Sequence, residues 1–437
     1  MMAIKTPLED WIAVKVGVKP GNLTPEILKQ YQLKKIRQTL RWVKEKSLFY
    51  RKKLEGVEPE HITDFEHFAK LPFTFPCDLQ ENPLAFVCSK LTEISRIVTL
   101  QSSGTTGQPK RVFFTSGDQE LTIDFFDYGM RNLVGPQDRV MILLPCQQPG
   151  SVGDLLQKGL ERLGAFPIPY GLVTDTKDAI EQAILHRATA MVGVPIQILA
   201  MARHQDGAKL QGKIRSVLLS TDYVPAAICH AIKAAWQAEI FNHYGMTEMG
   251  LGGGVQCQAL AGYHLREADL YFEIVDPETG RVLPPGETGE IVFTTLTRTG
   301  MPLIRYRTGD LSRFLEKPCA CGTVLRSLDL VKYRISERIK VGDEFLAMPD
   351  LDEKIFSFPG VLNYHAVCRE VNKKKEIYLE ILMAEGYSLP EVAVKKNLFT
   401  IPAIKNSYPQ YLHINVKQTQ AAAKFYQGGA KRKILQK

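Results

Sequence analysis

A run of hydroxyl and glycine residues is the first part of the sequence that could carry chemistry. It comprises Ser102, Ser103, Gly104, Thr105, Thr106 and Gly107, followed by Lys110. Glycines let backbone N–H groups approach an anion closely, and hydroxyl and ammonium groups donate hydrogen bonds to phosphate oxygens. The spacing differs from the P-loop pattern, because Gly104 and Gly107 lie too close together and neither Ser nor Thr follows Lys110. The run predicts a phosphate-binding loop, with a polar turn as the alternative.

Thiol and imidazole residues form a second candidate site. Cys257 and His264 have six residues between them, and Cys319 and Cys321 follow with one residue between them. Thiolate and imidazole are the ligands that Zn²⁺ prefers, and four of them close a tetrahedral structural site. The alternative is a set of reduced, buried thiols beside a hydrogen-bonded histidine. The other cysteines are scattered and are interpreted as small apolar side chains: Cys77, Cys88, Cys146, Cys229 and Cys368.

The elements that must position these residues alternate in type between Arg139 and Tyr244. Extended runs are expected at 140–144, 165–169, 189–194, 216–219 and 239–242, with helices at 155–163, 179–186, 196–204 and 225–237. This alternation indicates βαβ units on a parallel sheet. A helix capped by Thr24 is expected nearer the N-terminus, with Ile36, Leu40 and Val43 on one face.

The pattern changes after Tyr263, where short β-rich runs are separated by turn signals such as Asp276-Pro277-Glu278-Thr279-Gly280. Such runs are typical of antiparallel hairpins. The last segment mixes strands and helices. We therefore expect an α/β fold in which a large N-terminal domain, residues 1–334, combines the parallel sheet with a β-rich subdomain. A small α+β domain, residues 335–437, completes the chain.

Composition excludes several classes of protein. The chain has 437 residues, of which 45% are hydrophobic, so it is neither disordered nor collagen-like. Its formal charge of +8 suits anionic ligands, and no platform of aromatic and basic residues indicates nucleic acid. Eight cysteines are too few for a disulfide scaffold of this size. No segment has the pattern of a signal peptide or of a membrane span, so a cytoplasmic protein without membrane contact is expected.

Three motifs, in order, resemble those of adenylate-forming enzymes, the superfamily of acyl-CoA synthetases and firefly luciferase. They are the run from Ser102 to Lys110, Tyr244-Gly245-Met246-Thr247-Glu248, and Tyr306-Arg307-Thr308-Gly309-Asp310. Taken singly, Asp310 after a glycine is typical of a turn, and Glu248 after a threonine is typical of a solvated helix start. Further runs are similar to the phenylacetate–CoA ligase branch: Phe49-Tyr50-Arg51, Leu71-Pro72-Phe73-Thr74, Asp276–Gly280 and Pro302–Arg307.

The resemblance implies a reaction in two steps. A carboxylate attacks the α-phosphate of ATP and pyrophosphate leaves; a thiol, commonly that of coenzyme A, then attacks the acyl-adenylate. The phosphate loop with Lys110 is implied to hold the β- and γ-phosphates, Thr247 the α-phosphate, and Glu248 a Mg²⁺ ion that neutralises phosphate charge. Asp310 is implied to accept hydrogen bonds from both ribose hydroxyls.

The remaining nucleotide contacts also come from the resemblance. Tyr244, with Gly245 beside it, is placed against the adenine ring. Ser220-Thr221-Asp222 corresponds to the adenine-contacting segment of the branch, and Arg334 is retained near the start of the C-terminal domain. Similar proteins carry a C-x₆-H and C-x-C set like the candidate zinc ligands, and the branch tends to form homodimers.

Three positions depart from the pattern of the family. Lys158 stands where aromatic residues line the acyl pocket, which favours a polar or acidic acid; the alternative is a solvated helix lysine. Ser336 replaces the hinge carboxylate, and a small polar residue can serve as a hinge. The position of the family's adenylation lysine is occupied by Gly429, and Lys431 is the expected substitute. The alternative is that Lys431 belongs to a solvated basic tail with Arg432 and Lys433.

We therefore predict a ligase that uses ATP, Mg²⁺ and coenzyme A to activate a small carboxylic acid, with a structural Zn²⁺ and a mobile C-terminal lid. One alternative keeps the adenylation and changes the acceptor, as in coenzyme F390 synthetases. Another is a nucleotide-binding homologue with weakened catalysis.

Overall fold

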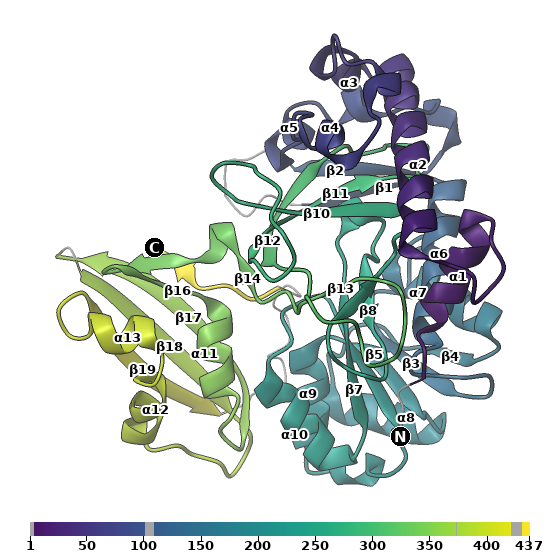
Figure 1. The fold of residues 1–437 in the computed structure, drawn as a ribbon. Coiled ribbons are helices and arrows are strands. Elements are labelled where there is room, and N and C mark those ends of the chain that lie inside the picture. Colours follow the sequence, from purple (N-terminus) through teal and green to yellow (C-terminus); the bar gives the residue numbers. More distant parts are fainter. Residues whose placement is uncertain (1–3, 101–108, 373, 421–430) are drawn as a thin grey trace. The chain divides into compact units, whose positions relative to one another are not determined.

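The computed structural model describes residues 4–100, 109–372, 374–420 and 431–437 (Figure 1). These residues form two compact units, neither of which is one continuous stretch of chain. Unit 1 comprises residues 1–135, 148–164 and 243–331, and unit 2 comprises residues 136–147, 165–242 and 332–437. The predicted domain boundary after residue 334 stays a prediction.

Unit 2 contains the parallel sheet that the sequence predicts. Its strands lie in the order β7 (Glu239–Tyr244), β6 (Ser216–Leu219), β5 (Ala190–Gly193), β3 (Arg139–Leu143), β4 (Phe166–Pro169). The helices between the strands are α8 (Thr176–Leu185), α9 (Pro195–Arg203) and α10 (Ala226–Trp236). Strands β3, β5 and β6 are almost wholly buried. Strand β4, with two prolines that cannot donate to the sheet, lies at the edge. The predicted alternation of strands and helices is confirmed.

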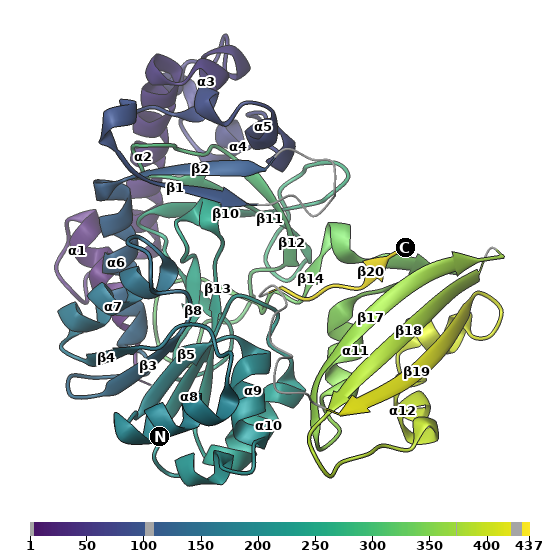
Figure 2. The same ribbon diagram turned by 180° about the vertical axis from the view of Figure 1, so that it is seen from behind.

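The rest of unit 2 is the predicted α+β segment. Its sheet has the strand order β19 (Leu412–Gln420), β18 (Lys374–Met383), β17 (Val361–Val371), β20 (Leu435–Gln436). The helices are α11 (Met348–Ile355), α12 (Glu391–Leu398) and α13 (Pro402–Ser407), which lie on the same face of this sheet (Figures 1 and 2). Short strands precede them: β14 (Tyr333–Arg334), β15 (Ile339–Val341) and β16 (Glu344–Leu346).

Unit 1 holds the antiparallel strands. One sheet contains β10 (Leu270–Val275), β11 (Gly289–Thr295) and β12 (Tyr306–Ser312) in that order. Strands β1 (Ile94–Leu100) and β2 (Lys110–Thr115) pair antiparallel, and the last two residues of β7 pair with β8 (Gly254–Gln256). Strands β9 (Tyr263–Leu265) and β13 (Ser327–Leu328) follow β8 in the same sheet. The predicted change to antiparallel pairing is confirmed.

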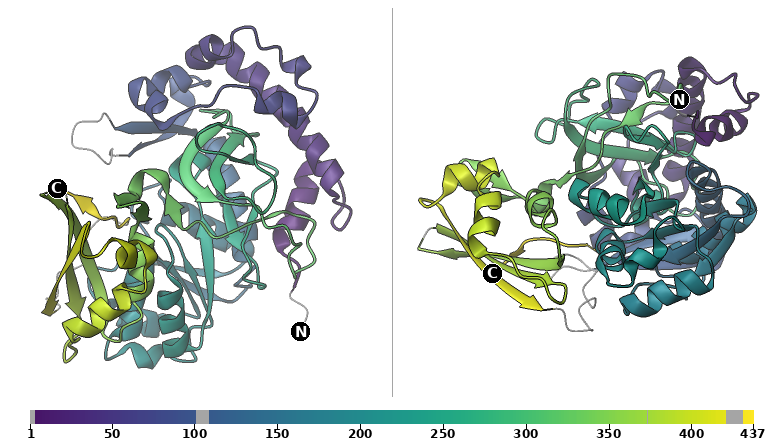
Figure 3. Two further views of the ribbon diagram at one scale, coloured as in Figure 1. Left: turned by 60° about the vertical axis from the view of Figure 1, so that its left-hand side comes forward. Right: turned by 90° about the horizontal axis from the view of Figure 1, so that it is seen from below.

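The helices of unit 1 come mostly from the N-terminal part of the chain. They are α1 (Pro7–Val16), α2 (Pro25–Lys46), α3 (Leu48–Lys53), α4 (Phe65–Ala69), α5 (Pro76–Glu81), α6 (Ser116–Met130) and α7 (Val152–Leu163). Helix α2 begins after Thr24, whose side chain accepts from Ile27 N, and buries Ile36, Leu40 and Val43 as predicted. Figure 3 shows it as the long purple helix beside the green strands of unit 1.

Two helices were not predicted from the sequence. Helix α1 is capped by Thr6 and buries Leu8, Trp11 and Ile12, whose i, i+3, i+4 spacing is the signal that could have found it. Helix α6 is capped by Thr115. It buries neighbouring residues such as Phe125 and Phe126, so its apolar residues form no single stripe. No helix in the described ranges combines the length and the apolar character that crossing a membrane requires.

Candidate active site

Residues from all three predicted motifs meet in unit 1. Lys110 is the first residue of β2, Glu248 lies in a single 3₁₀ turn (Thr247–Met249), and Tyr306 begins β12. The Lys110 ammonium forms an ion pair with Glu248 Oε1, and the Tyr306 hydroxyl donates to the same oxygen at 3.1 Å. Lys110 and Tyr306, 196 positions apart in the chain, thus share one carboxylate.

The Glu248 carboxylate is held in its charged form. It is only 2% exposed, and burial alone would raise its pKa. The Lys110 ammonium and the hydrogen bonds to the carboxylate outweigh burial, so the pKa lies below its ordinary value. Arg298 donates to the backbone carbonyls of Glu248 at 2.8 Å and of Phe113 at 3.1 Å, which ties the 3₁₀ turn to β2. A fixed, ionised carboxylate beside an ammonium suits a cation and a phosphate together.

Asp310 and Tyr244 also meet in unit 1. The Tyr244 hydroxyl donates to Asp310 Oδ2 at 3.0 Å, and both side chains are buried. This contact joins the second motif to the third. The placement of Tyr244 against an adenine ring and of Asp310 on a ribose stays a prediction.

The predicted cysteines and histidine form one buried cluster. The ligand atoms of Cys257, His264, Cys319 and Cys321 all lie within 4.8 Å of one another. Cys257 Sγ lies 3.6 Å from Cys319 Sγ, and Cys321 Sγ lies 3.5 Å from His264 Nε2. In a tetrahedral site with metal–sulfur bonds of about 2.3 Å, ligand atoms lie about 3.8 Å apart, so the spacing fits.

The three thiols of this cluster do not share one pKa direction: the pKa is raised at Cys257, where the hydrogen bond to Cys321 is the largest influence, and at Cys319, where burial is. The hydrogen bond from Cys257 is the largest influence on Cys321; with His264 it outweighs burial and lowers the pKa of that thiol, so a thiolate is favoured. His264 is buried, and within the described chain its Nδ1 atom has no hydrogen-bond partner. The donor set is therefore suited to Zn²⁺. Cys77, one of the cysteines interpreted as apolar, is instead exposed.

The predicted adenine segment lies in unit 2, directly after the carboxyl end of β6. Ser220 N donates to Gly193 O at 3.1 Å, and Thr221 has a φ of +77°, a backbone conformation rare for a β-branched residue. In parallel α/β sheets, ligands bind beyond the carboxyl ends of the strands. The segment therefore lies at the end of the sheet where ligands of such folds bind, and its contact with an adenine stays a prediction.

The C-terminal tail contacts that segment within unit 2. Arg432 N donates to Asp222 Oδ2 at 3.2 Å, and the Arg432 guanidinium forms an ion pair with Asp352 of α11. Burial raises the pKa of Asp222 to about 6, although Arg432 lowers it. The Arg432 side chain is only 9% exposed, so the interpretation of Arg432 as part of a solvated tail is wrong. Lys431, its neighbour, is exposed.

Two other predicted residues, Lys158 and Ser336, form no contact with these clusters among the residues that the structure describes. Lys158 of α7 is 48% exposed and pairs with Asp154 Oδ2 at 2.8 Å, as a solvated helix lysine would; its role in an acyl pocket stays a prediction. Arg334 lies in β14, and Ser336 is exposed in the next turn. Some predicted positions lie outside the described residues: Ser102, Ser103, Gly104, Thr105, Thr106, Gly107 and Gly429.

Comparison with known proteins decides the family. Residues 32–297 match the model of the family described as AMP-binding enzyme. The chain belongs to this family. It is 27% identical over 380 residues to a phenylacetate–coenzyme A ligase of Thermus thermophilus, covering 84% of each chain. It is 30% identical over 303 residues to the ligase of that name from Pseudomonas putida, covering 66% of this chain and 67% of that one.

The solved structures agree with the fold of an AMP-binding enzyme. A crystal structure of 2-hydroxyisobutyryl-CoA ligase in the postadenylation state has a TM-score of 0.79 at 20% identity, covering 95% of this chain and 90% of that chain. The predicted fold class and the predicted membership of the phenylacetate–CoA ligase-like branch are confirmed.

Sequence reasoning missed several residues that shape the site of this AMP-binding enzyme. Arg298 carries no recognisable signal in the sequence, and Arg432 enters the sequence analysis only as part of a solvated basic tail. An arginine beside a motif gives no sign of its burial. Glu290, which contacts the loop that carries Asp310, was also missed, because its role depends on strand pairing.

Proposed function

We propose that this protein is an AMP-forming carboxylate–CoA ligase. It activates a carboxylic acid as its acyl-adenylate and transfers the acyl group to coenzyme A. The comparisons with phenylacetate–coenzyme A ligases support this activity class. The observation that carries the proposal is the meeting of Lys110, Glu248 and Tyr306, from three separate motifs, at one ionised carboxylate.

In the first step, the residues of unit 1 bind and orient ATP. Lys110 contributes positive charge to the phosphates together with the loop before it, and Thr247 donates to the α-phosphate. Asp310 accepts hydrogen bonds from the ribose hydroxyls. Glu248 holds Mg²⁺, which when bound neutralises charge on the phosphates. A nucleotide that enters takes the Lys110 ammonium from Glu248 and leaves that carboxylate free for the cation.

In unit 2, Ser220-Thr221-Asp222 contacts the adenine, and the C-terminal segment after Arg334 acts as a lid that moves about Ser336. Arg432 anchors the tail to Asp222, which keeps Lys431 next to the adenine segment. We assign Lys431 the charge that bridges the acid and the α-phosphate.

The cluster of Cys257, His264, Cys319 and Cys321 holds a structural Zn²⁺. Four protein ligands close a tetrahedral site and leave no open position for substrate. Cys257 follows β8, His264 lies in β9, and the last two ligands precede β13. The ion would therefore join segments of unit 1 that are far apart in the chain.

Replacing Lys431 by alanine is expected to slow adenylate formation about 100-fold, because the positive charge beside the α-phosphate and the attacking carboxylate is lost. Transfer to coenzyme A from a synthetic acyl-adenylate should keep its rate. Single-turnover assays of each half-reaction provide the measurement, and Lys433→Ala is the matched control. An unchanged first half-reaction in Lys431→Ala would remove this residue from the site.

Exchange of pyrophosphate into ATP over a panel of carboxylic acids tests the proposed function. Exchange that depends on one acid, followed by an acyl-CoA product, supports it. Exchange without use of coenzyme A indicates a different acceptor, such as the deazaflavin of coenzyme F390 synthetases. ATP binding without any exchange indicates a nucleotide-binding homologue. The acid, the homodimer and the cytoplasmic location stay predictions.

A further inference from the structure

Asp310 lies on a bulge in the antiparallel pairing of β11 and β12. Val292 stands opposite Arg307, and Glu290 stands opposite Leu311. Residues 308–310 of β12 therefore face the single residue Ile291 of β11. A bulge bends its strand and changes the direction of the side chains next to it. Gly309 has a φ of +78°, which favours glycine, so the backbone at the bulge is sharply turned.

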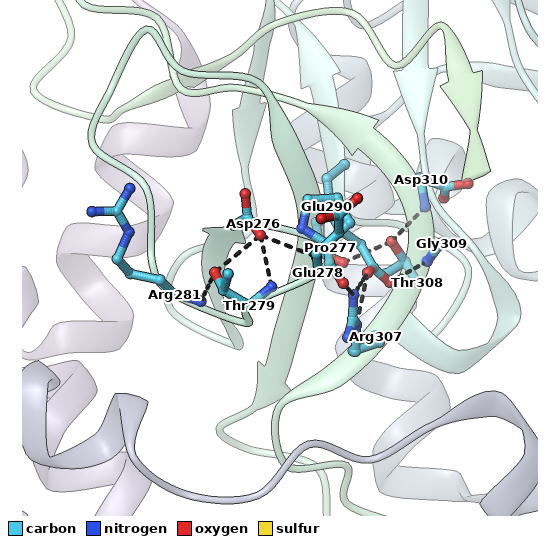
Figure 4. A network of polar contacts seen from close by, with 11 residues as sticks. Asp276, Pro277, Glu278, Thr279, Arg281, Glu290, Arg307, Thr308, Gly309 and Asp310 are labelled. Atoms are coloured by element: carbon cyan, nitrogen blue, oxygen red, sulfur yellow. Dashed lines mark hydrogen bonds and ion pairs between the residues drawn. The ribbon is translucent and has the colours of Figure 1, made fainter. Parts of the chain in front are cut away.

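Glu290 connects the two sides of this bulge. Its Oε1 atom accepts a hydrogen bond from Gly309 N at 2.8 Å, and its Oε2 atom accepts one from Arg307 Nε at 2.7 Å (Figure 4). The Arg307 Nη2 group contacts Oε2 as well. Glu290 is 3% exposed, so these bonds form away from water. One carboxylate thus fixes the residue before the bulge and the glycine inside it.

Thr308 supplies a second brace. Its hydroxyl donates to Ile291 O at 2.7 Å and accepts from Asp310 N at 3.0 Å. The first of these bonds satisfies a carbonyl that the bulge withdraws from regular pairing, and the second orients the backbone of Asp310 itself.

The turn at Asp276–Gly280 supports the other side of Arg307. Asp276 Oδ1 accepts from Glu278 N at 3.0 Å and from Thr279 N at 2.7 Å, which fixes the turn. Pro277 O then accepts from Arg307 Nη2 at 2.7 Å. Figure 4 shows this series of contacts, from the turn through Arg307 and Glu290 to the bulge. The proposed reaction leaves this turn motif and Arg307 without a role.

We propose that Glu290 is a positioning residue that sets the direction of the Asp310 carboxylate and so determines how strongly the enzyme selects a nucleotide with a ribose 2′-hydroxyl. This inference rests on the proposed function, in which Asp310 accepts from both ribose hydroxyls. Both hydrogen bonds form only when the carboxylate is held at one angle, because their strength falls steeply with misalignment. The braced bulge holds the backbone of Asp310, and the Tyr244 hydroxyl donates to its Oδ2 atom.

Glu290→Gln tests the proposal with little change in size. The glutamine oxygen can accept from Gly309 N–H or from the Arg307 guanidinium, but not from both. The NH₂ group must then face the other of these two donors, and that hydrogen bond is lost. We expect the ratio of kcat/KM for ATP to that for 2′-deoxy-ATP to fall about tenfold, the effect of losing one ordinary hydrogen bond. The KM of the acid should not change.

Glu273→Gln is the matched control. Glu273, on the neighbouring strand β10, is also 3% exposed and pairs with Arg305 at 3.0 Å. Its backbone stands opposite Val292, but no hydrogen bond that the structure describes joins its side chain to Glu290 or to residues 308–310. Both variants should lower the melting temperature, and only Glu290→Gln should change the nucleotide ratio. An unchanged ratio in Glu290→Gln, or an equal fall in Glu273→Gln, would overturn the proposal.

A second variant covers the case in which Glu290→Gln does not fold. Thr308→Val keeps the side-chain shape and removes the other brace, so it should also lower the ratio; an unchanged ratio would count against the proposal. Calorimetric binding of AMP and 2′-deoxy-AMP gives the same comparison without turnover. The wild-type protein could show no pyrophosphate exchange and still bind AMP more tightly than 2′-deoxy-AMP, with Glu290→Gln reducing that preference. This result would count against the proposed function alone.

Discussion

Replacing Asp310 by alanine is expected to lower kcat/KM for ATP by about 100-fold or more. Two hydrogen bonds to a charged acceptor are lost, each worth about 1.5–3 kcal/mol, and about 1.4 kcal/mol corresponds to a factor of ten. The fold should survive, because Asp310 lies on a bulge held by the backbone and by Glu290 and Thr308. Pyrophosphate exchange and calorimetric ATP binding, with a thermal melt of the same sample, provide the measurement.

Asp329→Ala is the control for this prediction. Asp329 is an aspartate of the same unit that is partly exposed and pairs with Arg313 at 3.0 Å, outside the candidate site. Its replacement should leave both ATP affinity and melting temperature nearly unchanged, because an exposed pair contributes little. If Asp310→Ala bound ATP as tightly as the wild-type protein does, the assignment of Asp310 to the ribose would have to be abandoned.

Removing one of the candidate zinc ligands should cause the largest loss of stability. Cys321→Ala leaves three ligands, and we expect the protein to lose its metal and with it about 5 kcal/mol or more of stability. At about 2 °C per kcal/mol for a unit of this size, the melting temperature should fall by about 10 °C. Elemental analysis should find about one zinc per wild-type chain and much less in the variant.

Cys88→Ala separates the metal from simple packing. Cys88 is a buried thiol of unit 1 that lies outside the cluster, so its replacement removes the same sulfur atom from a core. Removing that sulfur atom should lower the free energy of unfolding by about 1 kcal/mol, as the removal of other small buried groups does. Wild-type protein that is folded, was purified without added zinc and holds less than half an equivalent of zinc would argue against the site. Equal melting temperatures of the two variants would do the same.

Most elements of the fold could be predicted because their signals are local. The helix after Thr24 has a capping residue and an apolar stripe, and β6 is a short apolar run at Ser216–Leu219 that matches its predicted bounds. Helix α6 could not be predicted in this way, because Phe125 and Phe126 are neighbours in the chain and both are buried. Its periodicity is hidden when a helix is covered on more than one side.

The candidate site divides in the same way. The motifs that end in Lys110, Glu248 and Asp310 are recognisable in the chain, since glycines, hydroxyls and carboxylates suit a nucleotide at those spacings. Their mutual contacts are not recognisable. Arg432 shows the limit most clearly: its neighbours predict a solvated basic tail, and yet its side chain is buried against Asp352 and close to Asp222.

The sequence by itself determined the alternation of strands and helices between Arg139 and Tyr244, the three motifs, and the identity of the four candidate metal ligands. The elements and motifs depend on residues that are close in the chain, through periodicity, capping or spacing, and the metal ligands are recognisable as two such local pairs. Only the tertiary structure decided that Lys110 pairs with Glu248, that the cysteines and the histidine lie within 4.8 Å of one another, and that Glu290 braces the bulge under Asp310. The physical reason is that these contacts depend on which strands pair and in what register. A one-residue shift in register turns every side chain of a strand to the other face.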